Sequence, residues 1–398
     1  MKAPRKPTVL IGACGIGLGH VGRTLPVARS LRKRGWDVVF STYGDSVSFC
    51  LKQGFPAFKE VELRYGVKPD GSLSLRETFR TSIKSLVSFA SQLRSEISVI
   101  RHTRPTVVLS DSRLSTLIAA RLLGVPSVLI MHEFKLLIPS EEDMRGPLRL
   151  LKQLFERAIL EFFGLGWDLA NRVLITDFPP PLTVAGPTVV LPEFLRHKAQ
   201  FVGMVSSPRL GVSKPGARAR LGVRQDRRLV YFGISGLPEE RRKMSQVLLP
   251  IARRVSELGF SVVYTSGEPG GVAQTQVNRS FRVFPWIPDR SLAYEASDVF
   301  VTVGGQTSVG EALRYALPMI VIPTPNHSEH RVIGENIQRL GLGVKIEFRE
   351  LCFDNFYRAL NTVLGDGYLR NVQSAARFVE KYDAVELIVR AVEELASG

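Results

Sequence analysis

Residues 8–23 read TVLIGACGIGLGHVGR, an apolar run followed by a glycine-rich loop that leads into a helix. The run Thr8–Gly12 is apolar throughout, which is typical of a strand buried on both faces of a parallel sheet. Four glycines precede the helix expected over Gly22–Gly35, so the backbone can approach a ligand closely at the positive end of that helix. This order predicts an α/β domain that binds its ligand at the carboxyl edge of the sheet.

The alternation of strands and helices continues along the chain and is interrupted once. In the first half, further strands are expected at Asp37–Ser41, Val107–Ser110, Ser127–Met131, Val173–Thr176 and Phe201–Val205. A stretch rich in Ser, Pro, Gly and Arg follows. The alternation then restarts, with strands expected at Leu229–Ile234, Ser261–Thr265, Phe281–Phe284, Val299–Val303 and Met319–Ile322.

The expected fold is therefore α/β, with two doubly wound Rossmann-like domains that face each other across a cleft. The first domain is expected over residues 1–205 and the second over residues 221–370, with a linker at 206–220. A helical segment at 371–398 is expected to cross back onto the first domain.

Composition limits the class of protein. A chain of 398 residues with 44% hydrophobic and 23% charged residues is globular and long enough for two cores. The chain has no run of apolar residues long enough to span a bilayer, and its three scattered cysteines predict a cytoplasmic protein rather than a disulfide framework. The net charge of +16 suggests a nucleic acid, a phosphorylated substrate or an acidic membrane as partner, although a solubilising surface would give the same excess.

His20 stands at the tip of the first glycine loop. The spacing Gly17-x-Gly19-x-x-Gly22 also fits a dinucleotide fingerprint, but no acidic residue ends the second strand to bind a ribose, and Asp45 comes late. A histidine at this position can act as a general base near neutral pH. The structural alternative is a histidine that caps the helix.

A second loop, GGQTSVGEAL over residues 304–313, follows the strand Val299–Val303 and opens a helix. Backbone amides and hydroxyls at such a helix start can hold a diphosphate. Glu311 lies three residues after Ser308, so it either accepts hydrogen bonds from ribose hydroxyls or forms a capping box with Ser308.

These two loops, together with the stretch from Pro323 through His327 and His330 to Asn336, resemble the GT-B glycosyltransferases. The most similar branch is the MurG-like one, with the monogalactosyldiacylglycerol synthases, and the resemblance extends from Val9 to about Gly343. It implies a nucleotide-sugar site that comprises Gly19, Ser235, Gly236, Ile287, Gly305, Gln306, Thr307, Ser308, Glu311, Glu329 and His330.

The resemblance also assigns roles to these residues. Glu311 corresponds to the ribose-binding glutamate, and the loop around Thr307, with Ser235 and Gly236, corresponds to the diphosphate cradle. The backbone around Ile287 corresponds to the segment that reads the uracil edge. Glu329 and His330 fall where the family contacts sugar hydroxyls, although the segment leading to Asn336 is one residue longer here than in the usual pattern.

The catalytic residues implied by the resemblance are His20, as the base for the acceptor hydroxyl, and Asp111, as the carboxylate that orients it. Asp111 could instead cap the helix expected at Ser115–Leu123. The implied reaction is a single displacement at the anomeric carbon, which inverts its configuration. No Asp-x-Asp motif occurs, so we expect no metal and no cofactor besides a UDP-sugar co-substrate. Arg23 would add positive charge near the phosphates or lie on the surface.

The segment Arg145–Trp167 has the pattern of a basic amphipathic helix. Its apolar stripe includes Leu151, Phe155 and Phe162, and basic residues flank the stripe. Such a helix can lie in a membrane interface, or it can pack its apolar face on the sheet. With the basic first half, this favours a lipid or lipid-linked acceptor and a peripheral location on the cytoplasmic membrane face.

Three other functions remain open from the sequence. A UDP-GlcNAc 2-epimerase would share the architecture and nucleotide site without needing an acceptor or a membrane. A non-catalytic sugar-nucleotide-binding subunit would need no base such as His20. A nucleic-acid role is compatible with the charge, but no recognised binding motif occurs, so no nucleic acid is expected as a partner.

Overall fold

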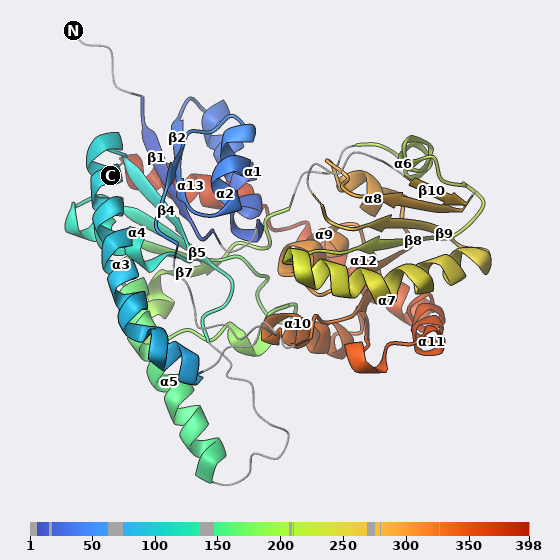
Figure 1. Cartoon of the computed structure of the whole chain (residues 1–398). Coiled ribbons are helices and arrows are strands. Elements are labelled where there is room, and N and C mark those ends of the chain that lie inside the picture. Colours follow the sequence, from blue (N-terminus) through green and yellow to red (C-terminus); the bar gives the residue numbers. More distant parts are fainter. Residues whose placement is uncertain are drawn as a thin grey trace. The chain divides into compact units, whose positions relative to one another are not determined.

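In the computed structural model, the chain forms two compact units (Figure 1). Unit 1 comprises Met1–Pro179, Pro187–Val205 and Asp383–Gly398, and unit 2 comprises Pro180–Gly186 and Ser206–Tyr382. The residues described are 6–15, 18–62, 75–135, 147–206, 209, 211–268, 275–278, 280–325 and 327–397.

Unit 1 alternates strands and helices. Its elements are β1 (Thr8–Ala13), α1 (Gly19–Lys33), β2 (Asp37–Thr42), α2 (Asp45–Lys52), β3 (Ala57–Lys59), α3 (Leu75–Thr103), β4 (Val107–Asp111), α4 (Leu114–Leu122), β5 (Ser127–Met131), α5 (Pro147–Trp167), β6 (Arg172–Ile175), the 3-10 helix η2 (Glu193–Lys198), β7 (Ala199–Phe201) and α13 (Ala384–Ser397).

The seven strands of unit 1 form one parallel sheet in the order β3-β2-β1-β4-β5-β6-β7. Alternate residues of β1 point to opposite faces, as expected for the period of a strand. Val9 and Ile11 join a core with α1 and α13, whereas Leu10 joins a core with α3 and α4. The sheet is therefore covered on both faces, which explains its continuous apolar strands.

Unit 2 repeats this architecture. Its elements are α6 (Lys214–Leu221), β8 (Leu229–Gly233), α7 (Pro238–Glu257), β9 (Ser261–Thr265), β10 (Thr275–Asn278), β11 (Phe281–Phe284), α8 (Ser291–Ala296), β12 (Val299–Thr302), α9 (Gln306–Arg314), β13 (Met319–Val321), α10 (Ser328–Arg339), β14 (Gly343–Lys345), the 3-10 helix η3 (Phe348–Glu350), α11 (Phe353–Val363) and α12 (Asp366–Val379). A further 3-10 helix, η1 (Gly186–Thr188), spans a boundary between the units.

The strand order in unit 2 is β10-β11-β9-β8-β12-β13-β14, and only the edge pair β10–β11 is antiparallel among the described strands. Phe232 packs with α7 and α11 on one face of the sheet. Tyr231 points to the other face, where its ring lies 5.5 Å from Tyr294 of α8 and 5.2 Å from Phe300. The prediction of two doubly wound α/β domains is confirmed.

The boundaries differ from the expected ones in two places. The expected linker at 206–220 ends early, because α6 begins at Lys214 and Arg218 is bonded to Asp298 of unit 2 at 2.7 Å. The C-terminal segment expected from residue 371 contains two helices. Of these, α12 belongs to unit 2 and only α13 returns to unit 1.

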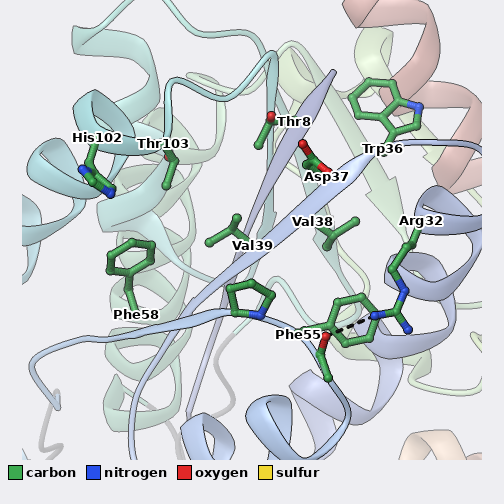
Figure 2. A pocket seen from close by; sticks show the side chains of 12 residues that line it. Thr8, Arg32, Trp36, Asp37, Val38, Val39, Phe55, Phe58, His102 and Thr103 are labelled. Carbon is green, nitrogen blue, oxygen red and sulfur yellow. Dashed lines mark hydrogen bonds between the residues drawn. The ribbon is translucent and has the colours of Figure 1, made fainter. Parts of the chain in front are cut away.

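A pocket of about 500 Å³ opens at the amino-terminal edge of the unit 1 sheet (Figure 2). Thr8 and Asp37, the first residues of β1 and β2, line it together with His102 near the end of α3. Arg32 closes one side, with its guanidinium 4.1 Å from the centroid of the Phe55 ring. Doubly wound sheets bind ligands at the opposite, carboxyl edge.

Candidate active site

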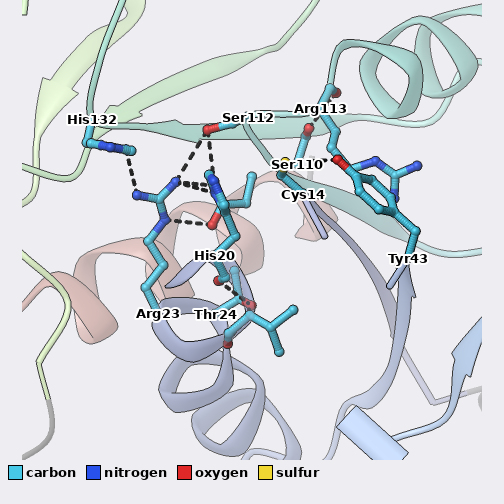
Figure 3. A network of polar contacts seen from close by, with 11 residues as sticks. Cys14, His20, Arg23, Thr24, Tyr43, Ser110, Ser112, Arg113 and His132 are labelled. Carbon is cyan, nitrogen blue, oxygen red and sulfur yellow. Dashed lines mark hydrogen bonds and ion pairs between the residues drawn. The ribbon is translucent and has the colours of Figure 1, made fainter. Parts of the chain in front are cut away.

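His20 and Asp111 meet at the carboxyl edge of the unit 1 sheet. Figure 3 shows the polar contacts around His20. His20 lies in the first turn of α1 and Asp111 is the last residue of β4. The Nδ1 atom of His20 lies 2.9 Å from Oδ1 of Asp111, and Asp111 is fully buried. Because Asp111 holds Nδ1, the Nε2 atom of the ring is the one that can accept a proton.

Neither residue has the structural role that the sequence left open. The residue before α1 is Leu18, and no side chain caps that helix start. The residue before α4 is Arg113, again without a side-chain cap. Capping therefore does not account for His20 or for Asp111.

The structure gives Arg23 a role that the sequence did not assign to it. It is 6% exposed, and its Nε donates to Oδ2 of Asp111 at 2.6 Å. Burial raises the pKa of Asp111, but the charges and hydrogen bonds of Arg23 and His20 outweigh burial and hold that pKa well below its usual value. Asp111 is therefore ionised. Arg23 is not on the surface, and its guanidinium is bonded to Asp111.

In unit 2, the second glycine loop lies at the carboxyl end of β12. Gly304 has a φ of 95°, and a β-carbon there would come within 3.0 Å of the His330 carbonyl oxygen, so the position requires glycine. Gly305 precedes α9, whose start has no side-chain cap. A β-carbon on Gly305 would lie 3.7 Å from Ser235 Oγ, which brings the loop after β8, with Ser235 and Gly236, beside this helix start.

Glu311 lies in α9 together with Gln306, Thr307 and Ser308. The capping box between Ser308 and Glu311 does not form, since the helix already begins at Gln306. Glu311 instead forms an ion pair with Arg290, whose NH2 atom lies 3.1 Å from Oε2. The NH1 atom of Arg290 also donates to Ser308 Oγ at 3.4 Å. The negative charge of Glu311 raises the pKa of Arg290. Burial lowers that pKa, but the effect of Glu311 is larger, so the pKa is raised overall.

The remaining predicted residues are spread around this edge of unit 2. Ile287 is buried in the turn between β11 and α8. Glu329 lies half-buried in the first turn of α10. His330 is buried beside it, with Nδ1 3.1 Å from Thr324 Oγ1 and its ring stacked on His327. Asn336 donates to the Val184 carbonyl at 3.0 Å, a contact within unit 2 that fixes the backbone.

Gly19 is the only predicted nucleotide-sugar residue in unit 1. It is the first residue of α1, and a β-carbon there would meet nothing within 4 Å. Gly17, which the dinucleotide fingerprint would need, lies outside the described residues. The structure thus gathers His20 and Asp111 in unit 1 and the predicted nucleotide-sugar residues other than Gly19 in unit 2.

Helix α5 exposes most of its apolar residues. Seven large apolar side chains are exposed, among them Leu151 at 63% and Phe162 at 70%. The exposed set is Leu150, Leu151, Leu154, Phe155, Phe162, Phe163 and Leu165. The alternative of a helix that packs this stripe on the sheet is therefore wrong. Among the described residues, no helix combines the length and apolar character needed to cross a membrane.

Three comparisons relate the chain to known proteins. Residues 233–392 match the family model described as UDP-glucoronosyl and UDP-glucosyl transferase. A Methanosarcina acetivorans protein described as an uncharacterized glycosyltransferase is 24% identical over 381 residues, which cover 88% of this chain and 91% of that relative. The UDP-N-acetylglucosamine–N-acetylmuramyl-(pentapeptide) pyrophosphoryl-undecaprenol N-acetylglucosamine transferase of Acetivibrio thermocellus is 31% identical over 216 residues, which cover 50% of this chain and 56% of that relative. The crystal structure of MurG from Acinetobacter baumannii covers 98% of this chain and 99% of its own, with a TM-score of 0.60 at 16% identity.

Proposed function

Because this chain is a glycosyltransferase of the GT-B fold with MurG-like relatives, we propose that it moves a hexosyl or N-acetylhexosaminyl group from a UDP-sugar to a hydroxyl of a lipid or lipid-linked acceptor. The observation that carries this proposal is the contact between His20 and the buried, ionised Asp111. Such a pair can remove a hydroxyl proton at neutral pH. The reaction takes place at a membrane surface on the cytoplasmic side, which fits three free cysteines.

The proposed reaction divides its tasks between the two units. Nε2 of His20 takes the proton of the acceptor hydroxyl as that oxygen bonds to the anomeric carbon. The bond from this carbon to the diphosphate oxygen breaks, and the electron pair leaves with UDP. One displacement inverts the anomeric configuration. His20 then carries the proton and releases it to solvent.

The leaving diphosphate is assigned to the start of α9. The amides of a helix start and the positive end of the helix dipole attract anions, and Arg290 adds a positive charge 3.4 Å from Ser308 Oγ. The carboxylate of Glu311 accepts hydrogen bonds from the ribose hydroxyls, and the backbone at Ile287 binds the edge of the uracil. Glu329 and His330 contact the sugar. These groups stabilise the leaving group with no metal ion required.

The lipid acceptor is supported by α5. Its seven exposed apolar side chains form a surface that water solvates poorly. Arg149 and Arg157 are exposed on the same helix and can meet anionic headgroups. The apolar stripe predicted from the sequence also contains Leu148, whose side chain lies outside the described part of the structure. Arg145, at the start of the predicted segment, lies outside the described residues.

The first experiment tests the transferase. Nucleotide release is measured with UDP-, dTDP- and GDP-sugars in the presence of mixed lipid acceptors, for the wild type, His20→Ala and Glu311→Ala. His20→Ala should cut turnover at least a hundredfold and leave UDP affinity near normal, whereas Glu311→Ala should weaken UDP binding. Equal turnover in His20→Ala would reject the base. Conversion of UDP-GlcNAc to its epimer without an acceptor would reject transfer.

The second experiment tests whether α5 binds a membrane surface. The triple change of Phe155, Phe162 and Leu151 to Ser should reduce co-sedimentation with anionic liposomes and leave UDP affinity unchanged. Leu258, exposed at the end of α7 in unit 2, provides the matched control as Leu258→Ser. If the triple variant co-sedimented with liposomes as much as the wild type, the proposed membrane binding by α5 would be rejected.

A further inference from the structure

Arg23 is the centre of a polar network that joins the carboxyl ends of β4 and β5 to α1 (Figure 3). Besides its 2.6 Å bond to Asp111 Oδ2, its NH2 group bonds to Oδ1 of the same carboxylate. Its NH1 atom lies 2.6 Å from Nδ1 of His132, the residue after β5. One buried guanidinium thus contacts both His132 and the carboxylate that holds His20.

The contact with Arg23 fixes the proton of His132. A guanidinium has only donors and keeps its charge in proteins. At 2.6 Å, Nδ1 of His132 must therefore be the acceptor, with a lone pair directed at Arg23. A neutral imidazole with a lone pair on Nδ1 carries its hydrogen on Nε2. His132 thus presents an N–H at its other nitrogen.

His20 has two possible partners at one nitrogen. Its Nδ1 lies 2.9 Å from Asp111 Oδ1 and 2.9 Å from the NH2 atom of Arg23. With hydrogen on Nδ1, the ring donates to the carboxylate, and NH2 uses its two hydrogens on Asp111 and on Ser112 Oγ at 3.3 Å. With hydrogen on Nε2 instead, the lone pair of Nδ1 would face the carboxylate oxygen at 2.9 Å, which is repulsive. The network therefore favours hydrogen on Nδ1.

We propose that Arg23 is a positioning residue that holds the two histidines in opposite tautomers, Nδ1–H on His20 and Nε2–H on His132. The mechanistic value of this inference rests on the proposed transfer, in which His20 is the base. An unpaired buried Asp111 would draw a proton onto His20, and the resulting imidazolium would no longer be a base. Arg23 supplies the positive charge that Asp111 requires, so Asp111 can orient the ring while the ring stays neutral.

The ionisable groups that contact His20 within the described part of unit 1 are the carboxylate of Asp111, the guanidinium of Arg23 and, ring to ring, His132. The His20 and His132 ring centroids lie 6.3 Å apart. One ring offers an acceptor and the other a donor at its Nε2 atom. Replacing Arg23 should therefore change which ring nitrogen carries the hydrogen in both histidines at once.

The test determines directly which ring nitrogen of each histidine carries a hydrogen. Protein labelled with ¹⁵N in the histidine rings is studied at pH 7.5 by two-bond ¹H–¹⁵N correlation spectra, with His20→Gln and His132→Gln to assign the signals. The wild type should show Nδ1–H for His20 and Nε2–H for His132. In Arg23→Gln, His20 should move toward the imidazolium pattern and His132 should average its two tautomers. Arg29→Gln is the control, because Arg29 lies exposed on the same helix and bonds only to Gln53 among the described contacts.

The outcomes are separable. The opposite tautomer on either ring of the wild type overturns the inference, and so does an unchanged spectrum in a folded Arg23→Gln variant. If Arg23→Gln does not fold, the wild-type spectrum and Arg23→Lys, which keeps the charge but has no planar fork, still decide it. In nucleotide-release assays, the acid limb of kcat/KM should shift to higher pH in Arg23→Gln by about one unit. Absence of all turnover in the wild type would defeat the proposed function, while the spectra would still test the tautomers.

Discussion

The imidazole of His330 is buried in α10 beside His327 and Thr324. Burial, reinforced by the charge of His327, lowers the pKa of His330 to about 3. The ring is therefore neutral throughout the physiological range. A neutral ring can still bond to a sugar hydroxyl, but it adds no charge to the proposed diphosphate site.

This burial predicts an acid-sensitive contribution to stability. Because the folded pKa lies below the unfolded value of 6.5, the unfolded state binds a proton that the folded state does not. The free energy of unfolding should therefore fall as pH falls from about 6.5 toward 3, by up to about 1.4 kcal/mol per pH unit. Urea unfolding between pH 4 and 7 should show a smaller slope for His330→Gln than for the wild type, and identical slopes would contradict the burial argument.

A second prediction for a single residue concerns Arg290, whose positive charge should contribute to binding of the UDP-sugar donor. Without Arg290, the carboxylate of Glu311 would stand uncompensated near the assigned diphosphate and repel it. Arg290→Gln should therefore weaken UDP affinity about tenfold, or roughly 1.4 kcal/mol, by calorimetry. Arg290→Gln combined with Glu311→Gln should lose less than the sum of the single changes, because the repelling charge is gone. Strict additivity would mean that the two side chains act independently.

At the scale of the element, α5 has two unlike faces. Leu160 and Trp167 pack against the sheet of unit 1, and Gly164 allows Pro192 to approach the helix. Glu156 is also on the buried side and pairs with Lys135 at 3.4 Å. The exposed face carries Phe162. The helix therefore needs only a narrow strip of its surface for packing and leaves a broad apolar strip outside.

Substitutions on the two faces should separate stability from membrane binding. Leu160→Ala should lower the free energy of unfolding by about 2–5 kcal/mol, because it leaves a cavity in the core. Phe162→Ser should change that free energy by about 0.5 kcal/mol or less. Guanidinium unfolding of both variants provides the measurement. A loss of several kcal/mol in Phe162→Ser would show that this face is packed in solution.

The strands β5, β9 and β11, of four or five residues each, could be placed from the sequence at their observed bounds. The short strands β3 and β14, of three residues each, were missed because so few residues establish no periodicity. The strand expected at Phe201–Val205 ends at Phe201, because it lies at the edge of the sheet. An amphipathic pattern predicted α5, but a stripe that wide does not reveal which side is packed.

The predicted candidate residues follow the two glycine loops, where motif spacing is informative. The ion pairs of Arg23 and Arg290 were not predicted, because an arginine in an ion pair is recognised only by its partner. Asp111 lies 88 residues from Arg23 in the sequence, and no local sequence pattern indicates that the two side chains pair. Long-range ion pairs of this kind are set by the strand order of the sheet, which brings β4 next to β1.

At the scale of the whole molecule, unit 1 is completed by the last helix of the chain. Ala384, Ile388, Val389 and Val392 of α13 are buried in the core that contains β1 and α1. Arg34 of unit 1 reaches Glu393 at 2.8 Å on its rim. Unit 2 has a core of its own that contains none of these residues.

Removal of residues 384–398 should therefore affect the two units differently. The truncated chain should lose a cooperative transition that belongs to unit 1, because the apolar face that α13 covers would be open to water. UDP affinity, assigned to unit 2, should be retained. Calorimetric unfolding with and without UDP gives the measurement, and an unaltered thermogram would show that α13 contributes little.

The return of α13 also affects how the protein emerges from the ribosome. Roughly 180 residues separate Val205 from Asp383, so the sheet of unit 1 is finished long before its last covering helix exists. At typical translation speeds this interval lasts about 10–40 seconds. During that time, the nascent chain displays an uncovered apolar patch while unit 2 is still being made, which is the window in which a chaperone would be needed.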